Sequence, residues 1–433
     1  MTFYLRRCMM RSMSITLLLL LVLPLLAGGC GERIEEIERP EKIVSMREVV
    51  YDKETYVKLA ALWKTYNDRL PSEDSYANWM YAARYAQDPD YESLLKSGRE
   101  RYPANPVLMY LAAMVHHGKT NGLENQHLLE RATRLEPSYM DPWFSLVVHH
   151  MERRENEKLD IALRRLLEAG VVQDEVMDLS YNMMALLDKN AILITNGDND
   201  TYPGWILTRI VKYRPDVTIV NRSLLNTDWY PDCLSQTNSI TLMSSGKLDT
   251  LRAQILSAIK EGKKEMPSGG PFSDTLIALL IGVAEREGRP VYFAHTVAST
   301  ETIDRFRSNG RSLGLVTLVT HSSEPYSVQL RRMAKTWKEE FRTSGLKSWR
   351  VKYAPIASAG RQLVANYAVG QYVILEAIVQ QAPEYQQDLF GWYVKYVREL
   401  ISGKYAEGVD KAWCRASDVK EIRDWCRKRS TIE

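Results

Sequence analysis

The sequence has little net charge, few cysteines and, beyond its first thirty residues, no long apolar run. Its 433 residues carry 57 lysines and arginines against 54 aspartates and glutamates, which gives a formal net charge of +3. A chain this close to neutral lacks the basic surface typical of nucleic-acid binding, so we predict no nucleic-acid partner. No later segment approaches the roughly 20 apolar residues that a membrane helix needs, so we expect the mature chain to be soluble.

The one pronounced apolar run lies at the N-terminus. Three arginines near the start of the chain precede an uncharged stretch from Ser14 to Ala27, which leads into L-A-G-G-C ending at Cys30. A basic start before a short apolar run is typical of a secretory signal, and small residues before a cysteine resemble the bacterial lipoprotein signal. We therefore predict a signal peptide over 1–29 and an envelope protein tethered through lipid on Cys30. An uncleaved N-terminal anchor is the alternative. Gly31 favours the outer membrane, with the chain facing the periplasm or the cell surface.

Three cysteines remain after the lipidation site. Cys233 stands apart, whereas Cys414 and Cys426 each follow a tryptophan and lie close together in the chain. In an oxidising envelope this pair fits a disulfide. Two buried free thiols fit the sequence equally well, because connectivity cannot be read from spacing.

The pattern of apolar residues divides the remaining chain into four segments. Residues 30–55 are rich in charge and are expected to be a linker. Residues 56–188 have a helical pattern throughout, residues 189–322 alternate strands with helices, and residues 323–433 are helical again. We predict a helical domain, then an α/β domain with a mostly parallel, Rossmann-like sheet, and then a C-terminal helical region.

A regular interval recurs through the first helical segment. The interval from Pro103 to Pro137 is the same as the one from Leu95 to Leu129, and Leu163 follows after the same step again. A period of about 34 residues is that of the tetratricopeptide repeat, a helix–turn–helix unit. Such repeats stack into a concave surface that binds other proteins, so we expect an envelope protein partner.

Two histidine pairs, His116-His117 and His149-His150, keep the same register. His116 and His150 are separated by the same interval as Pro103 and Pro137. A metal site is one interpretation, and equivalent positions on stacked helices are the other. No aspartate or glutamate stands at helical ligand spacing from them, so we expect no metal there and no cofactor in the protein.

Polar and aromatic residues follow the first two expected strands, Ala191–Thr195 and Asp216–Asn221. Open α/β sheets place ligand crevices at the carboxyl ends of their strands. Amides and carboxylates beside aromatic rings suit a glycan or a peptide, although the aromatic rings could instead cover a sheet edge. We expect a ligand crevice formed by Asn196, Asp198, Asn199, Asp200, Asn221, Asn226, Asp228, Trp229 and Tyr230, with His295 at the end of a third strand.

Asp198 and Asp200 have the D-x-D form in which two carboxylates can face one divalent cation. The alternative is a turn and helix cap, because aspartate and asparagine are favoured in both. His295 is the histidine placed to act as a base, or it is structural. With no clear pair of nucleophile and base, we expect a non-catalytic protein. A metal-dependent glycosyltransferase or glycan hydrolase is the alternative.

Three stretches carry a resemblance to a known family. They read T-N-G-D-N-D-T-Y-P-G-W, R-P-D-V-T-I-V-N-R-S-L-L-N-T-D-W-Y and R-P-V-Y-F-A-H-T-V. Over about Asn190 to Tyr367 the chain resembles the soluble C-terminal region of bacterial membrane proteins related to protein O-mannosyltransferases. The resemblance implies an envelope-exposed α/β segment with tetratricopeptide-like helices. The membrane module that would hold the family's catalytic aspartate is missing from the sequence, so we expect a binding or scaffold component of envelope glycosylation.

Overall fold

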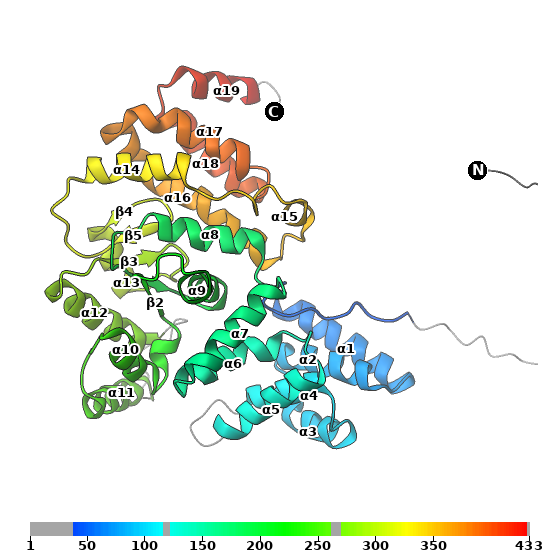
Figure 1. Cartoon of the computed structure of the whole chain (residues 1–433). Helices are drawn as coiled ribbons and strands as arrows, with labels where there is room; N and C mark the ends of the chain where they lie inside the picture. The colour runs from blue at the N-terminus through cyan, green and yellow to red at the C-terminus, as the bar shows by residue number, and fades with distance from the viewer. Residues whose placement is uncertain (1–37, 116–121, 261–269, 431–433) are drawn as a thin grey trace, which may run out of the picture. The chain divides into compact units, whose positions relative to one another are not determined.

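The computed structural model describes residues 38–115, 122–260 and 270–430. The expected signal peptide, the lipidation site Cys30 and the pair His116-His117 lie outside these ranges. From Pro40 onward the chain forms one compact unit. It is mostly helical, at 66%, with a small mixed five-stranded sheet (Figure 1).

A series of helices leads up to the sheet. They are α1 (Lys53–Arg69), α2 (Glu73–Ala86), α3 (Tyr91–Arg101), α4 (Pro106–Val115), α5 (Gly122–Leu135), α6 (Asp141–Glu152), α7 (Asn156–Glu168) and α8 (Asp174–Ala185). Side-chain oxygens of Asp52 and Ser72 cap α1 and α2, and Pro142 lies in the first turn of α6, where it needs no hydrogen-bond partner.

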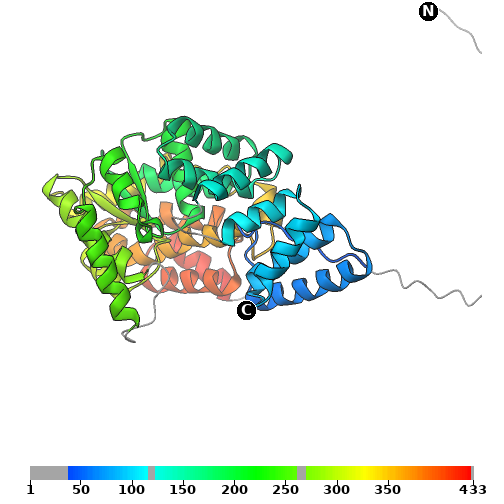
Figure 2. The ribbon, with the colours of Figure 1, turned by 90° about the horizontal axis from the view of Figure 1, so that it is seen from below.

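The recurring interval corresponds to a repeated position in this helical region. Leu95, Leu129 and Leu163 lie in α3, α5 and α7, and all three are buried. Consecutive helices pack against one another from α4 through α7. Figure 2 shows α1 to α3, in blue, on the side of the unit away from the strands.

The sheet has the strand order β2-β1-β3-β5-β4. Its strands are β1 (Ile192–Thr195), β2 (Thr218–Asn221), β3 (Val291–Ala294), β4 (Arg311–Ser312) and β5 (Val316–Leu318). β1 pairs in parallel with β2 and β3, whereas β5 pairs antiparallel with both β3 and β4. The sheet is therefore mixed, and the expectation of a mostly parallel sheet is wrong for the side that holds β4 and β5. A short connection that contains Gly314, at φ +85°, separates β4 from β5, and so short a connection can only reverse the chain.

Helices α9 (Asp198–Trp205), α10 (Tyr230–Asn238), α11 (Ser245–Lys260), α12 (Gly270–Arg286) and α13 (Glu301–Asn309) connect the strands. α9 continues into a π-helix, Ile206–Val211. It begins directly after β1, so Asp198 and Asp200 belong to its first turn rather than to a free loop.

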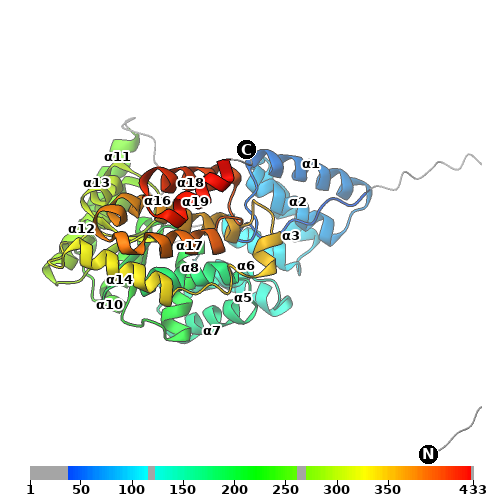
Figure 3. The ribbon, with the colours of Figure 1, turned by 90° about the horizontal axis from the view of Figure 1, so that it is seen from above.

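The C-terminal helices are α14 (Tyr326–Glu339), α15 (Trp349–Tyr353), α16 (Ala359–Gln381), α17 (Gln386–Tyr396), α18 (Gly403–Ala416) and α19 (Lys420–Ser430). Figure 3 shows α14 and α16 to α19 gathered together, with α8 beside them. Among the described helices, α16 is long and apolar enough to cross a membrane, but it packs on α8, α17 and α18 and buries many of its side chains there. Cys414 and Cys426 form a disulfide that joins α18 to α19, with 6.0 Å between their Cα atoms.

Buried apolar residues form two clusters. One lies within α1 to α6, and the larger one joins α6 to α8, the sheet and the C-terminal helices. Trp143 contacts both clusters. The helical segment and the α/β segment therefore share a core, since α6 to α8 pack with the strands.

The second half of the expected linker packs against the helices. In this N-terminal segment, Pro40–Asp52, Ile43 is buried and its backbone N–H donates to Asn78 Oδ1 at 3.2 Å. Further along, Val50 N–H donates to the carbonyl of Ala357 at 3.1 Å. The segment runs from α2 to the start of α16, so it is part of the folded unit.

Candidate functional site

A cavity of about 930 Å³ lies between the ends of β1 and β2 and the N-terminal helices. Because β1 and β2 are parallel neighbours, with Thr195 opposite Asn221, the polar residues that follow them meet at one edge of the sheet. The expected site residues divide into two groups there. Five of them line the cavity, namely Asp198, Asn199, Asn226, Asp228 and Trp229. The other five, Asn196, Asp200, Asn221, Tyr230 and His295, are not among its lining residues.

Asp200 holds the turn after β1 together. Its carboxylate accepts the backbone N–H of Asn196 at 2.7 Å and that of Gly197 at 2.9 Å, and it also accepts the Thr296 hydroxyl. Burial raises the pKa of Asp200, while these hydrogen bonds act in the opposite direction. Both oxygens are therefore occupied by the protein, and Asp200 has a structural role.

The amides of Asn196 and Asn221 hold neighbouring loops. Asn196 Oδ1 accepts the backbone N–H of Ala298 at 3.1 Å. Asn221 donates to Thr201 Oγ1 at 2.9 Å and accepts the N–H of Leu224 at the same distance. The Asn221 backbone N–H in turn donates to the hydroxyl of the buried Tyr230 at 3.1 Å. These amide groups are used inside the protein, so they are not presented to a ligand.

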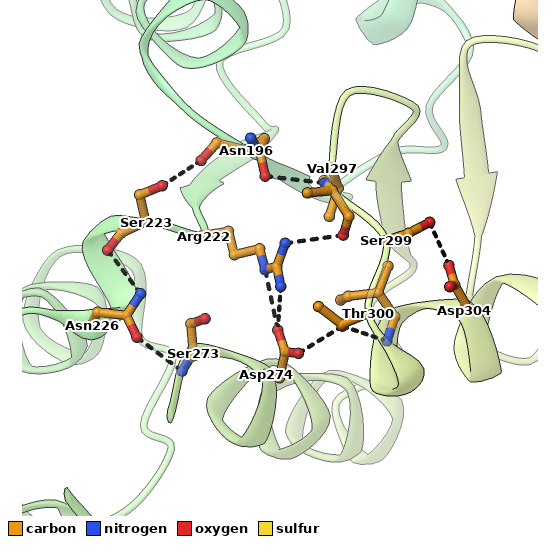
Figure 4. A network of polar contacts seen from close by, with 12 residues as sticks. Asn196, Arg222, Ser223, Asn226, Ser273, Asp274, Val297, Ser299, Thr300 and Asp304 are labelled. Carbon is orange, nitrogen blue, oxygen red and sulfur yellow. Dashed lines mark hydrogen bonds and ion pairs between the residues drawn. The ribbon is translucent and has the colours of Figure 1, made fainter. Parts of the chain in front are cut away.

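A buried ion pair completes this edge of the sheet (Figure 4). The Arg222 guanidinium lies 2.7 Å from Asp274 Oδ1 and donates to the carbonyl of Ala298 at 3.0 Å. The other Asp274 oxygen accepts the Thr300 hydroxyl at 2.6 Å. The pair thus joins β2, α12 and the start of α13. Sequence reasoning missed both charged residues, because nothing near Arg222 in the chain indicates a partner 52 positions away.

His295 lies at the antiparallel side of the sheet. Its Nε2 is 3.4 Å from Thr317 Oγ1 in β5. Burial, and to a lesser extent the charge of Arg307, lower the pKa of His295 to about 4. The imidazole is therefore neutral at physiological pH, and its position beside β5 rather than on the cavity favours the structural alternative over that of a base.

The opposite wall of the cavity comes from the N-terminal segment, from helices of the N-terminal region and from α9. It includes Arg47, Arg84, Tyr85, Tyr110, Arg153 and Tyr202. None of these was expected from the sequence, because they lie in segments assigned to a linker, to repeats or to the body of a helix. The one local signal is on α2, where Tyr81, Arg84 and Tyr85 share a helical face.

Arg47 joins the two walls. Its guanidinium lies 3.3 Å from Asp141 of α6 and 3.1 Å from Asp198 of α9. The same group lies over the ring of Phe144, 4.6 Å from the centroid. Asp198 and Asp200 consequently face different partners, and the structure does not bring them together on one ion. Across the described residues, no group of three or more histidines, cysteines, aspartates and glutamates is arranged to hold a metal.

The cavity is partly open to solvent, and rings, amides and charged groups line it. Trp229 and Tyr85 are partly exposed on opposite walls, and Tyr110 and Tyr202 form a deeper, buried surface. Asn199 supplies an amide beside them, whereas the Asn226 amide donates to the carbonyl of Ser223 and accepts the backbone N–H of Ser273. Aromatic faces bind apolar surfaces and amides bind hydroxyls, so the cavity is suited to binding a polar organic ligand.

Comparison with known families gives one match. Residues 176–249 are similar to TMEM260-associated domain 2, a domain named for the protein O-mannosyltransferase TMEM260. The matched residues run from α8 into α11, so they include both polar strand ends and Trp229. Neither the curated proteins nor the solved structures include a significant match to the chain.

Proposed function

We propose that the protein is a lipid-anchored component of the bacterial cell envelope that binds a glycan in the cavity between its helical and α/β parts. The cavity itself carries this proposal. At about 930 Å³ it lies within the size range of ligand sites, roughly 300–1,000 Å³, and residues from both parts of the chain line it.

The chemistry of the lining favours a glycan over an apolar small molecule. Trp229 and Tyr85 provide partly exposed rings that can stack on the faces of sugar rings. Asn199 lies on the same wall as Trp229 and provides an amide group that can bind hydroxyls. An apolar ligand would exclude water from this amide and from the charged side chains of the lining, which disfavours its binding.

The helical region supports a second role as a protein-binding scaffold. Buried leucines that recur at a constant interval in α3, α5 and α7 are typical of tetratricopeptide repeats, and we propose that these helices belong to that class. The similarity to TMEM260-associated domain 2 connects the cavity's strand ends with protein glycosylation. A scaffold that binds both a protein partner and a glycan fits that setting without requiring catalysis by this chain.

A binding experiment with oligosaccharides tests the glycan site. We expect the purified protein to bind members of an array of bacterial surface oligosaccharides. Trp229→Ala should weaken that binding about fivefold or more, because stacking on one ring contributes on the order of 1 kcal/mol or more. Trp349→Ala is the matched control, since Trp349 is 70% exposed and does not line the cavity. Absence of oligosaccharide binding, or equal losses in the two variants, would contradict the proposal.

Membrane fractionation tests the anchor separately. The change Cys30→Ala should release the protein from membranes or stall its processing, because the lipid is the expected membrane attachment. If the variant still fractionates wholly with membranes after a high-salt wash, the lipoprotein proposal is wrong while the glycan site remains to be judged by its own experiment.

A further inference from the structure

The charged side chains that line the cavity are equal in number of each sign, but they differ in whether they form ion pairs. Six charged side chains contribute to its wall, Arg47, Arg84, Glu152, Arg153, Asp198 and Asp228. Arg47 is paired with Asp198, and Asp228 is paired with Arg252. Two arginines, Arg84 and Arg153, and one glutamate, Glu152, remain without an ion pair among the described residues.

Arg84 lies in the last turn of α2. Its guanidinium lies 5.2 Å from the ring centroid of Tyr85 and 6.0 Å from that of Tyr110. Its Nη1 atom is shielded from solvent and has no hydrogen-bond acceptor in the described part of the chain. Nor does any described carboxylate form an ion pair with Arg84, so aromatic rings are its main neighbours.

Arg153 lies at the C-terminal end of α6, one turn after His149. Its Nε atom is likewise shielded and without an acceptor among the residues that the structure describes. The adjacent Glu152 does not form an ion pair with it within those residues. Burial raises the pKa of Glu152, while the charge of Arg153 acts to lower it. Two half-buried guanidinium groups on different helices therefore face one cavity with donors that the described protein groups do not use.

Guanidinium groups with unused donors are costly to hold away from water. They bind carboxylate and phosphate oxygens through paired hydrogen bonds, which satisfy those donors and neutralise the charge. We infer that the ligand of this cavity is an acidic oligosaccharide whose carboxylate or phosphate groups bind Arg84 and Arg153. This inference rests on the proposed glycan-binding function and adds the class of glycan. The rings of Tyr85 and Trp229 favour sugar over an acidic peptide as the carrier of the charge.

Calorimetric titration with defined oligosaccharides tests the inference. The probes are tetragalacturonate, its fully methyl-esterified form, a mannose oligosaccharide with a 6-phosphate, its unphosphorylated form, and an acetylated tetraglutamate peptide. We expect at least one acidic sugar to bind at least tenfold more tightly than its neutral counterpart and to weaken as salt is raised. Comparison of each acidic sugar with its own neutral counterpart shows whether the site prefers a carboxylate or a phosphate.

The variants Arg84→Gln and Arg153→Gln should each reduce binding of the acidic sugar at least tenfold and change binding of the neutral form less than twofold. Arg101→Gln is the matched control, because Arg101 also lies in the last turn of a helix and over a neighbouring tyrosine, but outside the cavity. Circular dichroism melts confirm that each variant is folded, and Arg84→Lys provides a variant that keeps the charge if Arg84→Gln does not fold.

The outcomes separate the inference from the proposed function. If neutral and acidic sugars bind equally, or if the arginine variants bind normally, the inference is wrong and the glycan site stands. If no sugar binds, both are wrong. If only tetraglutamate binds and depends on both arginines, the cavity is a peptide site, which overturns the inference and the proposed function together.

Discussion

Arg47 lies 3.3 Å from Asp141, and this ion pair fixes the N-terminal segment onto α6. The Asp141 side chain is only 2% exposed and also accepts the hydroxyls of Tyr81 and Tyr139. The second partner of Arg47, Asp198, is 47% exposed and lies 3.1 Å away. One arginine thus holds the helical wall of the cavity against the strand-end wall, and its two partners differ sharply in burial.

We predict that the two ion pairs of Arg47 contribute unequally to stability. Arg47→Gln should lower the free energy of unfolding by about 3 kcal/mol, because it leaves the buried Asp141 without a cation. Asp198→Asn should lower it by less than about 1 kcal/mol, because an exposed pair is screened by water. Urea denaturation of both variants provides the measurement. Losses of equal size would show that the buried pair is not the dominant contact.

Sequence reasoning was most successful where the signal is local. The short apolar runs at β1 and β2 have the lengths of buried strands, and the polar residues after Thr195 and Asn221 do lie at one edge of the sheet. The antiparallel half was missed because apolar runs specify a strand but not the direction of its neighbour. The tight turn at Gly314 decides that direction, and it lies inside the run from Leu313 to Thr320, which the sequence pattern predicts to be one strand.

Only half of the residues expected at the ligand site line the cavity, and the reason is related. Asp198 and Asp200 look equivalent in sequence, yet one faces Arg47 and the other is enclosed by backbone N–H groups. Which of the two neighbouring carboxylates faces the cavity depends on how α9 is oriented after β1. The helical wall, with Arg84 among others, meets the strand ends only through tertiary packing, so no local pattern could assign it to the site.

We predict a pH dependence that arises from His295. Its pKa is about 4 in the folded protein against 6.5 for an unperturbed histidine, so the unfolded state binds the proton more strongly. The contribution of His295 to the free energy of unfolding is fully present above pH 6.5. As the pH falls toward 4 this contribution is lost, which lowers the free energy of unfolding by up to about 3 kcal/mol. His295→Asn should remove this part of the pH dependence of the free energy of unfolding, measured by urea denaturation between about pH 7.5 and pH 4. His321→Asn, at an exposed position, is the control. Parallel profiles for wild type and His295→Asn would contradict the prediction.

The disulfide between Cys414 and Cys426 should stabilise the C-terminal helices. It closes a short loop that holds α19 on the body, where Trp425 packs against Phe390 with 5.1 Å between ring centroids. Replacing both cysteines with serine should lower the free energy of unfolding by about 2–3 kcal/mol, because short loops give contributions of this size. Dithiothreitol should reduce the wild type to the same level and leave the serine variant unchanged. A wild type that does not respond to the reductant would show that the bond contributes nothing.

The last prediction separates Asp198 from Asp200. Asp200→Asn should lower the free energy of unfolding by about 2 kcal/mol, because an amide has one oxygen where the carboxylate uses two to accept the N–H groups of Asn196 and Gly197 and the Thr296 hydroxyl. Asp198→Asn is the neighbouring control and should have a much smaller effect, since its side chain is exposed.

The same two variants decide whether the D-x-D sequence binds a cation. Because both oxygens of Asp200 are occupied inside the protein and Asp198 is paired with Arg47, we expect calcium, magnesium and manganese to leave the melting temperature of the wild type unchanged at millimolar concentration. A ligand that binds the folded state raises the melting temperature with its concentration. A rise of that kind in the wild type that is absent from both Asp198→Asn and Asp200→Asn would establish a metal site and favour the metal-dependent enzyme over a binding protein.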